Sequence, residues 1–405
     1  MLRYAAALAV LGSISFCGSA ASAQPPSDFT ACEAAARNAK LEPIHFATDR
    51  PRLDQDGKPM VFDGDRPAFH GLVGFDGATS ATDHVVTFGI LNELGQPVED
   101  PQLPRQVARQ AAAPDAYASF ASRVVNAATP PDTDLVVYVH GYNTTFKGAT
   151  EAALTLRLGL SCATNFKRKI VVLFFAWPSA AKLLKPADDE VRAEWAYRDF
   201  KDVMDKLYAQ LPAGSSGAAS KRPFAVAHSM GNRFLLHEID RCEKPAPQQQ
   251  QQQLCFSRVA FVAPDVDSRY FADVMFLHKD AIEHATIYVS ARDKVLWASH
   301  AFHGEGRAGE GGNELLRFNS KRIGIDTVDA GYMQAGKLCH TYIDRPVVLF
   351  DIAKSFFGSL VPDAPTRFAV QRPDGGIGNY FEIVENEKSR VKAPCVGVPL
   401  RSQRY

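Results

Sequence analysis

The chain has 405 residues, in which 45 Lys and Arg balance 45 Asp and Glu, and 46% of its residues are hydrophobic. Acidic and basic residues are interspersed rather than clustered, which argues against a nucleic-acid partner. The length allows a substantial core in one enlarged domain or two, and no segment after residue 23 is long and apolar enough for a stable membrane span.

The first 23 residues have the features of a secretory signal peptide. Arg3 precedes an apolar run from Tyr4 to Phe16, and small residues end the segment at Ala23. The run is too short to cross a bilayer, and a small-residue cleavage site follows it before Gln24. We therefore expect residues 1–23 to be removed from an exported bacterial protein, periplasmic or secreted.

An even number of cysteines remains after residue 23: Cys32, Cys162, Cys242, Cys255, Cys339 and Cys395. In an exported chain this favours disulfides. We predict one pairing, Cys242 with Cys255, because these residues bracket a Pro- and Gln-rich loop whose ends must return to each other; two buried free thiols are the alternative. No paired Cys-x-x-Cys spacing indicates a metal site.

The chain changes character near Arg109. Residues 24–109 are rich in Pro, Gly and Asp, with strand-like runs at Ile44 to Ala47 and His84 to Ile90, and we interpret them as an irregular, partly stranded lead-in. From there to about His340, apolar runs alternate with amphipathic stretches, which is typical of βα units.

Short runs rich in Val, Phe or Ile predict strands buried on both faces, at Leu135 to Val139, Ile170 to Ala176, Phe224 to Ala227, Val259 to Val262 and Ala285 to Ser290. Helices are predicted between them, near Thr150 to Leu160, Glu190 to Gln210, Asn232 to Asp240 and Ser268 to His278. The pattern predicts an α/β fold, with a mostly parallel sheet covered by helices on both faces. Residues 24–340 are assigned to this domain and 341–405 to a C-terminal extension with one helix, Val348 to Leu360.

The segment around Ser229 carries the clearest chemical signal. An apolar strand from Phe224 runs into Ala227-His228-Ser229-Met230-Gly231, and a helix-compatible stretch follows. This is the nucleophile-elbow pattern with Ala227 in place of its first glycine. Small residues are needed two before and two after the serine, because the turn brings their backbones together. A surface serine in a tight turn is the alternative interpretation.

Oxyanion donors are expected at two backbone positions. A predicted strand ends at His140-Gly141-Tyr142, where such folds place one donor, and Met230 follows the nucleophile at a helix N-terminus. We assign the amides of Tyr142 and Met230.

A serine hydroxyl also needs a histidine base and an orienting carboxylate, in the chain order Ser, acid, His. Asp293 ends one predicted strand and is favoured as the acid over Asp265, which ends the strand before it. His340 lies late in the chain, after both acids, and is selected as the base. His300 and His303 also follow Asp293, but a local structural role is the better interpretation. His228 is expected to point away as a packing residue.

At these residues the sequence resembles the α/β-hydrolase superfamily, and more closely a bacterial branch of unknown function described as esterase- or lipase-like. The similar segments are Phe46–Arg50 (FATDR), Val139–Asn143 (VHGYN), Ala176–Ser179 (AWPS), Ala227–Asn232 (AHSMGN), Ala263–Asp267 (APDVD) and Asp293–Leu296 (DKVL). The resemblance implies a triad of Ser229, Asp293 and His340 without a cofactor. It also places the first segment within the catalytic domain. It does not supply a substrate.

These features predict an exported serine hydrolase that acts on a small-molecule or lipid-like carboxylic ester through an acyl-enzyme. An acyltransferase or amidase with the same triad is one alternative. A non-catalytic envelope-binding protein on the same fold is another. The sequence does not indicate the oligomeric state.

Overall fold

The computed structural model describes residues 35, 36, 39, 41–49, 85–92, 95–98, 107–108, 114–179, 186–211, 222–242, 255–311, 325–333, 338–361, 367–371 and 377–383. The predicted signal peptide, the cysteines at 32 and 395 and the glutamine-rich segment lie outside these residues.

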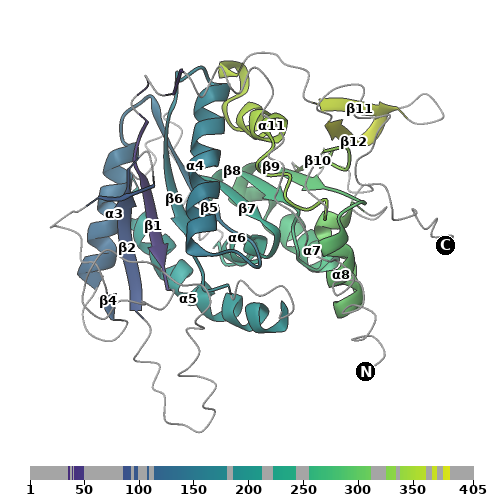
Figure 1. The fold of residues 1–405 in the computed structure, drawn as a ribbon, viewed down its shortest axis with the longest axis horizontal. Coiled ribbons are helices and arrows are strands. Elements are labelled where there is room, and N and C mark those ends of the chain that lie inside the picture. The colour runs from purple at the N-terminus through teal and green to yellow at the C-terminus, as the bar shows by residue number, and fades with distance from the viewer. Residues whose placement is uncertain are drawn as a thin grey trace, which may run out of the picture.

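A single sheet of twelve strands runs through the described residues (Figure 1). Its order is β11-β12-β10-β9-β8-β7-β5-β6-β1-β2-β3, and β4 also pairs with β2. The strands from β12 to β1 in this order are parallel, whereas β2, β3, β4 and β11 join antiparallel. Their bounds are Ile44–Thr48 (β1), Val85–Leu91 (β2), Pro97–Val98 (β3), Val107–Ala108 (β4), Thr133–Val139 (β5), Lys169–Phe175 (β6), Phe224–His228 (β7), Phe256–Val262 (β8), Ile282–Val289 (β9), Ile325–Asp329 (β10), Arg367–Gln371 (β11) and Ile377–Ile383 (β12).

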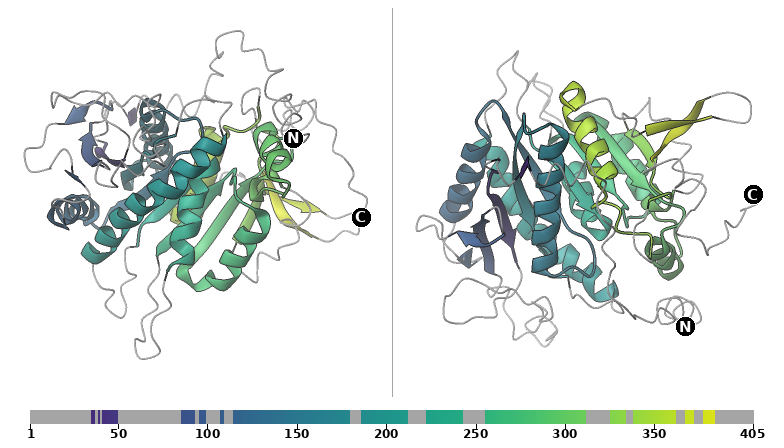
Figure 2. Two further views of the ribbon diagram at one scale, coloured as in Figure 1. Left: turned by 90° about the horizontal axis from the view of Figure 1, so that it is seen from below. Right: turned by 45° about the horizontal axis from the view of Figure 1, so that its top comes forward.

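Helices cover both faces of the sheet (Figure 2). The helices are α3 (Pro114–Ala128), α4 (Phe146–Ala163), α5 (Pro186–Gln210), α6 (Asn232–Asp240), α7 (Ser268–Leu277), α8 (Lys294–His303) and α11 (Pro346–Phe357). Alternate residues of a strand face opposite sides of the sheet, which gives the protein two cores. In the first core, Val136 and Tyr138 of β5 pack with α4 and α11. In the second core, Val137 and Val139 of β5 pack with α3, α5, α6 and α7. The predicted α/β fold with a mostly parallel sheet is confirmed, and the five predicted apolar runs lie in β5 to β9, except that Ala176 and Ser290, the last residues of two runs, follow β6 and β9.

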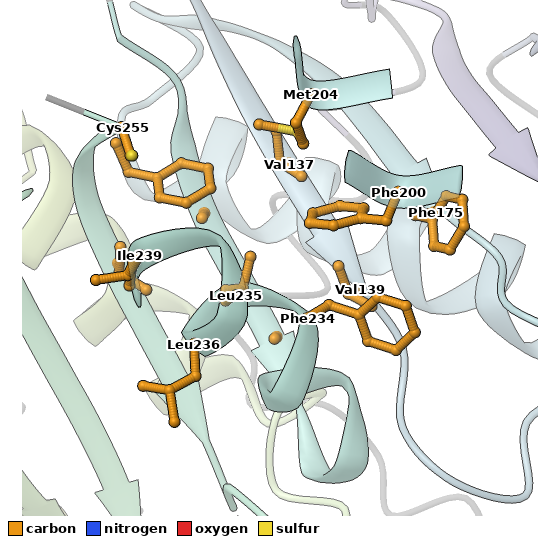
Figure 3. Close-up of a cluster of buried hydrophobic side chains, with 14 of the residues drawn as sticks. Val137, Val139, Phe175, Phe200, Met204, Phe234, Leu235, Leu236, Ile239 and Cys255 are labelled. Atoms are coloured by element: carbon orange, nitrogen blue, oxygen red, sulfur yellow. The ribbon is translucent and has the colours of Figure 1, made fainter. Parts of the chain in front are cut away.

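Aromatic and aliphatic side chains fill the second of these cores (Figure 3). Phe200 and Met204 of α5 lie beside Val137 of β5, and Phe234 of α6 approaches Phe175 of β6 with 5.7 Å between ring centroids. All of them are almost completely buried. Close packing of this kind holds α6, and with it the turn that precedes α6, in a fixed position on the sheet.

The lead-in and the C-terminal residues both contribute to this sheet. β1 contains the run predicted at Ile44 to Ala47 and pairs with β6, and β2 contains the run predicted at His84 to Ile90 apart from His84, which lies outside the described residues. At the other end of the chain, α11 packs against α4, where Leu349 contacts Gly159, and β12 pairs with β10. The proposed domain boundaries themselves stay predictions. No helix within the described part of the chain is both long and apolar enough to cross a membrane.

A disulfide joins Cys242 to Cys255, as the sequence predicts. It links the end of α6 to the start of β8, across a sequence separation of 13 residues. Cys162 and Cys339 are also disulfide-bonded.

Candidate active site

Ser229 lies in a sharp turn between β7 and α6. Its backbone φ of 53° falls in the left-handed region, which a non-glycine residue adopts at a cost of about 1–3 kcal/mol. The turn is held from both sides, because the Ser229 carbonyl accepts hydrogen bonds from the Asn232 side chain at 2.8 Å and from the backbone of Asp265 at 3.2 Å. The elbow predicted from the sequence therefore has the strained strand-to-helix geometry that projects a side chain at the end of a strand.

Gly231 is required by a close backbone approach. A Cβ atom placed on this residue would lie 2.4 Å from the carbonyl oxygen of His140 and 2.6 Å from that of Val139. Ala227, which replaces the first glycine of the elbow pattern, is accommodated fully buried in β7. The departure from the pattern thus falls at the position that tolerates a methyl group.

The Ser229 hydroxyl is buried and unpaired. The residue is 1% exposed, and its Oγ has no hydrogen-bond partner among the described residues. Most buried polar atoms are hydrogen-bonded, so an exception of this kind calls for an explanation such as a catalytic role.

Asp293 and His340 form a buried pair. Their Oδ2 and Nδ1 atoms lie 2.7 Å apart, and Oδ1 of Asp293 accepts hydrogen bonds from the backbones of Val295 and Leu296 at the start of α8. Because the carboxylate accepts from Nδ1, the other ring nitrogen, Nε2, is left as the basic atom.

The pKa values of this pair follow from burial and mutual contact. Burial alone lowers the pKa of His340, but the charge of Asp293 and the hydrogen bond to it raise that pKa above its usual 6.5. Burial raises the pKa of the Asp293 carboxyl, while His340 and the two backbone N–H groups oppose that rise. Proton transfer to His340 is therefore favoured by its partner.

His228 connects this pair to the elbow. Its Nε2 lies 3.2 Å from the His340 carbonyl oxygen, and the two imidazole rings are 4.8 Å apart. A carbonyl can only accept, so Nε2 of His228 carries a hydrogen. Burial, and secondarily His340, lowers the pKa of His228 to about 3. The expectation that His228 points away from the site is wrong, because its ring contacts the ring and the backbone carbonyl of His340. A neutral imidazole fits in this buried position between the end of β7 and the segment that carries His340.

The end of β5 lies against the nucleophile. A Cβ atom placed on Gly141 would be 2.8 Å from Cβ of Ser229 and 3.0 Å from Nδ1 of His228. The backbone of the proposed oxyanion segment is therefore adjacent to the elbow, and Met230 follows Ser229 in the first turn before α6. The roles assigned to the amides of Tyr142 and Met230 stay predictions.

Asp265 does not contact His340 but has other partners. Its Oδ1 accepts from Nε of Arg307 at 2.8 Å and from Oγ of Ser299 at 2.6 Å. Burial raises the pKa of this carboxyl, but the cations Arg307 and Arg233 outweigh it and hold the pKa below its usual value. Sequence reasoning did not foresee Arg307, because it lies 42 residues from its partner and no local pattern links them.

The two histidines of α8 pair with carboxylates. Nδ1 of His300 lies 3.0 Å from Glu310, and Nε2 of His303 lies 2.5 Å from Glu190 at the start of α5. Within the described ranges no group of three or more His, Cys, Asp or Glu side chains is arranged to hold a metal ion.

Comparison with known families adds to this geometry. The model of a family described as alpha/beta hydrolase of unknown function (DUF900) matches residues 117–353. The chain belongs to this family. The matched part of the chain begins in α3, ends in α11 and includes the elbow, the Asp293–His340 pair and the end of β5. No curated protein matches the chain.

Proposed function

We propose that this hydrolase is a serine esterase whose nucleophile is Ser229. The observation that carries the proposal is the unpaired, buried Oγ of Ser229 in a strained elbow, where the ring of the adjacent His228 lies 4.8 Å from the ring of His340, which in turn is hydrogen-bonded to Asp293. A hydroxyl, an imidazole with a free basic nitrogen and a buried carboxylate are the groups needed for acyl transfer through a covalent intermediate.

In the proposed acylation, Nε2 of His340 takes the Ser229 proton as Oγ bonds to the ester carbonyl carbon. The carbonyl electron pair moves to its oxygen, where the backbone N–H groups of Tyr142 and Met230 stabilise the negative charge. The carbon–oxygen bond to the alcohol then breaks, and the alcohol leaves with the proton held on His340. Asp293 stays ionised and keeps the imidazole oriented.

Deacylation repeats these steps with water. His340 takes a proton from water as the water oxygen bonds to the acyl carbon, and the bond to Oγ breaks. Ser229 recovers its proton from His340, which restores the starting state.

Active-site labelling tests the proposal. A fluorophosphonate probe should label the wild type and Ser257→Ala but not Ser229→Ala, and hydrolysis of a short-chain p-nitrophenyl ester should follow the same order. Ser257 is the matched control, because its hydroxyl donates to the carbonyl of Arg222 next to the amino end of β8, remote from the elbow. Absence of labelling in folded wild type contradicts the proposal and favours the non-catalytic alternative.

A substrate panel separates the hydrolase from its catalytic alternatives. Esters of graded acyl length, the matching amides and an added alcohol acceptor are compared with the same enzyme. Hydrolysis of esters that exceeds both amide cleavage and transfer to the acceptor is expected. Faster transfer than hydrolysis identifies an acyltransferase.

We also infer that the protein is exported. The signal-like residues 1–23 and the disulfide between Cys242 and Cys255 support this location, because stable disulfides are typical of oxidising compartments. N-terminal sequencing of the protein from a periplasmic or culture fraction is expected to begin at Gln24. An unprocessed chain found in the cytosol contradicts the inference.

A further inference from the structure

The backbone after β5 is held by three side-chain hydrogen bonds in succession. Nε1 of Trp177 donates to the His140 carbonyl at 2.8 Å, Nδ1 of His140 contacts the Gly141 carbonyl oxygen at 2.9 Å, and Oγ1 of Thr144 donates to the Tyr142 carbonyl at 3.2 Å. Three consecutive carbonyl groups are therefore fixed by side chains rather than by strand pairing.

Each of these bonds also sets the direction of an N–H group. In a planar trans peptide the carbonyl of one residue and the N–H of the next point in opposite directions. The bond between the His140 ring and the Gly141 carbonyl therefore turns the Tyr142 N–H away from that ring. This peptide matters most, because Gly141 lies against Ser229 and Tyr142 carries the assigned oxyanion donor.

Gly141 makes this orientation easy to lose. Without a Cβ atom, glycine passes readily between backbone conformations. Rotation of the peptide between Gly141 and Tyr142 would replace the N–H donor with a carbonyl acceptor beside the nucleophile. An oxyanion would then be repelled instead of stabilised.

The His140 ring is well placed to prevent that rotation. The residue is 1% exposed, and its ring stacks on the buried Trp177 ring, with centroids 5.2 Å apart and planes within 7°. Trp177 also binds the His140 carbonyl, so the ring and the backbone of His140 are both fixed. Because a carbonyl only accepts, Nδ1 of His140 must carry the hydrogen.

We propose that His140 is a positioning residue for the oxyanion hole: its Nδ1–H holds the Gly141 carbonyl so that the Tyr142 N–H remains directed at the reacting carbonyl oxygen. This inference rests on the proposed esterase function. The imidazole makes no bond to the substrate and exchanges no proton with it.

Two substitutions separate the hydrogen bond from the ring. His140→Asn keeps an N–H donor close to the position of Nδ1 but removes the stacked ring, and His140→Phe keeps a ring against Trp177 but removes the donor. We expect His140→Phe to lower kcat by roughly 10²- to 10³-fold, the usual loss of one oxyanion donor, with KM nearly unchanged. His140→Asn should retain most of kcat. A purely structural role of the stacked ring predicts the opposite order.

The ratio of kcat for an ester to that for its thionoester gives a readout specific to the oxyanion hole. A thiocarbonyl sulfur accepts hydrogen bonds more weakly than oxygen, so loss of a donor slows the ester more than the thionoester. The ratio should fall in His140→Phe and stay near the wild-type value in His140→Asn.

Crystal structures of the two variants provide a measurement that needs no turnover. The Gly141 carbonyl is expected to be rotated in His140→Phe and to keep its orientation in His140→Asn. A carbonyl that stays in place in His140→Phe, or an unchanged kcat and ester-to-thionoester ratio in that variant, overturns the inference. Failure of the proposed function is seen separately, as absence of Ser229-dependent ester hydrolysis in the wild type.

Discussion

Asp293 makes two sets of hydrogen bonds, and the substitution Asp293→Asn separates them. Oδ1 caps α8 through the N–H groups of Val295 and Leu296, each at 3.0 Å, and Oδ2 binds Nδ1 of His340. Asparagine has one carbonyl oxygen, which can keep both cap bonds. Its NH2 group then faces His340 and donates, so the imidazole hydrogen moves to Nε2, and the ring no longer accepts a proton from Ser229.

The expected loss of activity is large and the loss of stability small. The wrong imidazole tautomer should lower kcat by about 10⁴-fold, equivalent to about 5.5 kcal/mol of transition-state stabilisation. The cap of α8 is retained, so the free energy of unfolding should change by no more than about 1.5 kcal/mol. The assay combines hydrolysis of a p-nitrophenyl ester with urea unfolding.

Asp265→Asn is the matched control. It removes the charge that pairs with buried Arg307 at 2.8 Å, which should cost about 3–5 kcal/mol of stability. The His340 tautomer is unaffected, so the folded fraction should keep kcat within about tenfold of the wild type, a barrier change of about 1.4 kcal/mol. If Asp265→Asn abolishes turnover while Asp293→Asn remains active, the assignment of the acid is refuted.

Three further predictions concern pH and packing. His340 must be neutral to act as a base, and Asp293 raises its pKa above 6.5, so kcat/KM should fall as the pH drops through a value above 6.5. A pH–rate profile whose acid limb lies at or below pH 6.5 contradicts this. Gly231→Ala should cost about 1–3 kcal/mol in urea unfolding and slow fluorophosphonate labelling, because the new methyl group would lie 2.4 Å from the His140 carbonyl; normal stability and labelling would show that the turn can relax. Burial, and secondarily Arg123, lowers the pKa of His45 from 6.5 to about 4. Between pH 6.5 and pH 4 the unfolded chain therefore binds a proton at His45 that the folded protein does not, so the wild type loses stability as the pH falls through this range. His45→Leu should therefore stabilise the protein by about 2 kcal/mol more at pH 5 than at pH 8, and an equal gain in urea unfolding at both pH values rejects this reasoning.

Local sequence patterns were sufficient for most of the fold. The runs that became β5 to β9 are apolar on both faces, and only a strand covered by helices on each side buries them fully. Asp293 and Asp265 both follow predicted strands, so the preference for Asp293 rested on the general logic of the fold, and the structure places the Asp293 carboxylate 2.7 Å from Nδ1 of His340. The sequence did not suggest that Asp293 also begins α8, a helix that was not predicted.

Long-range contacts account for what the sequence did not indicate. Nε of Arg307 donates to the Asp265 carboxylate, although 42 residues separate the two in the sequence. The His228 ring contacts the His340 carbonyl oxygen across 112 residues of sequence. Trp177 belongs to a recognisable segment of the sequence, but its hydrogen bond to the His140 carbonyl depends on the pairing of β5 with β6. Periodicity and turn signals carry no information about such pairs.

The disulfide between Cys242 and Cys255 has a consequence for protein engineering. It links the end of α6 to the start of β8, at the amino end of that strand, whereas the elbow lies at the carboxyl end of β7. The disulfide therefore holds these two points of the chain together whatever the number of residues between them. Lengthening a closed loop adds only about 0.6 kcal/mol per doubling. A reporter domain or an affinity tag could therefore be inserted between the two cysteines, away from the strand ends that carry Ser229.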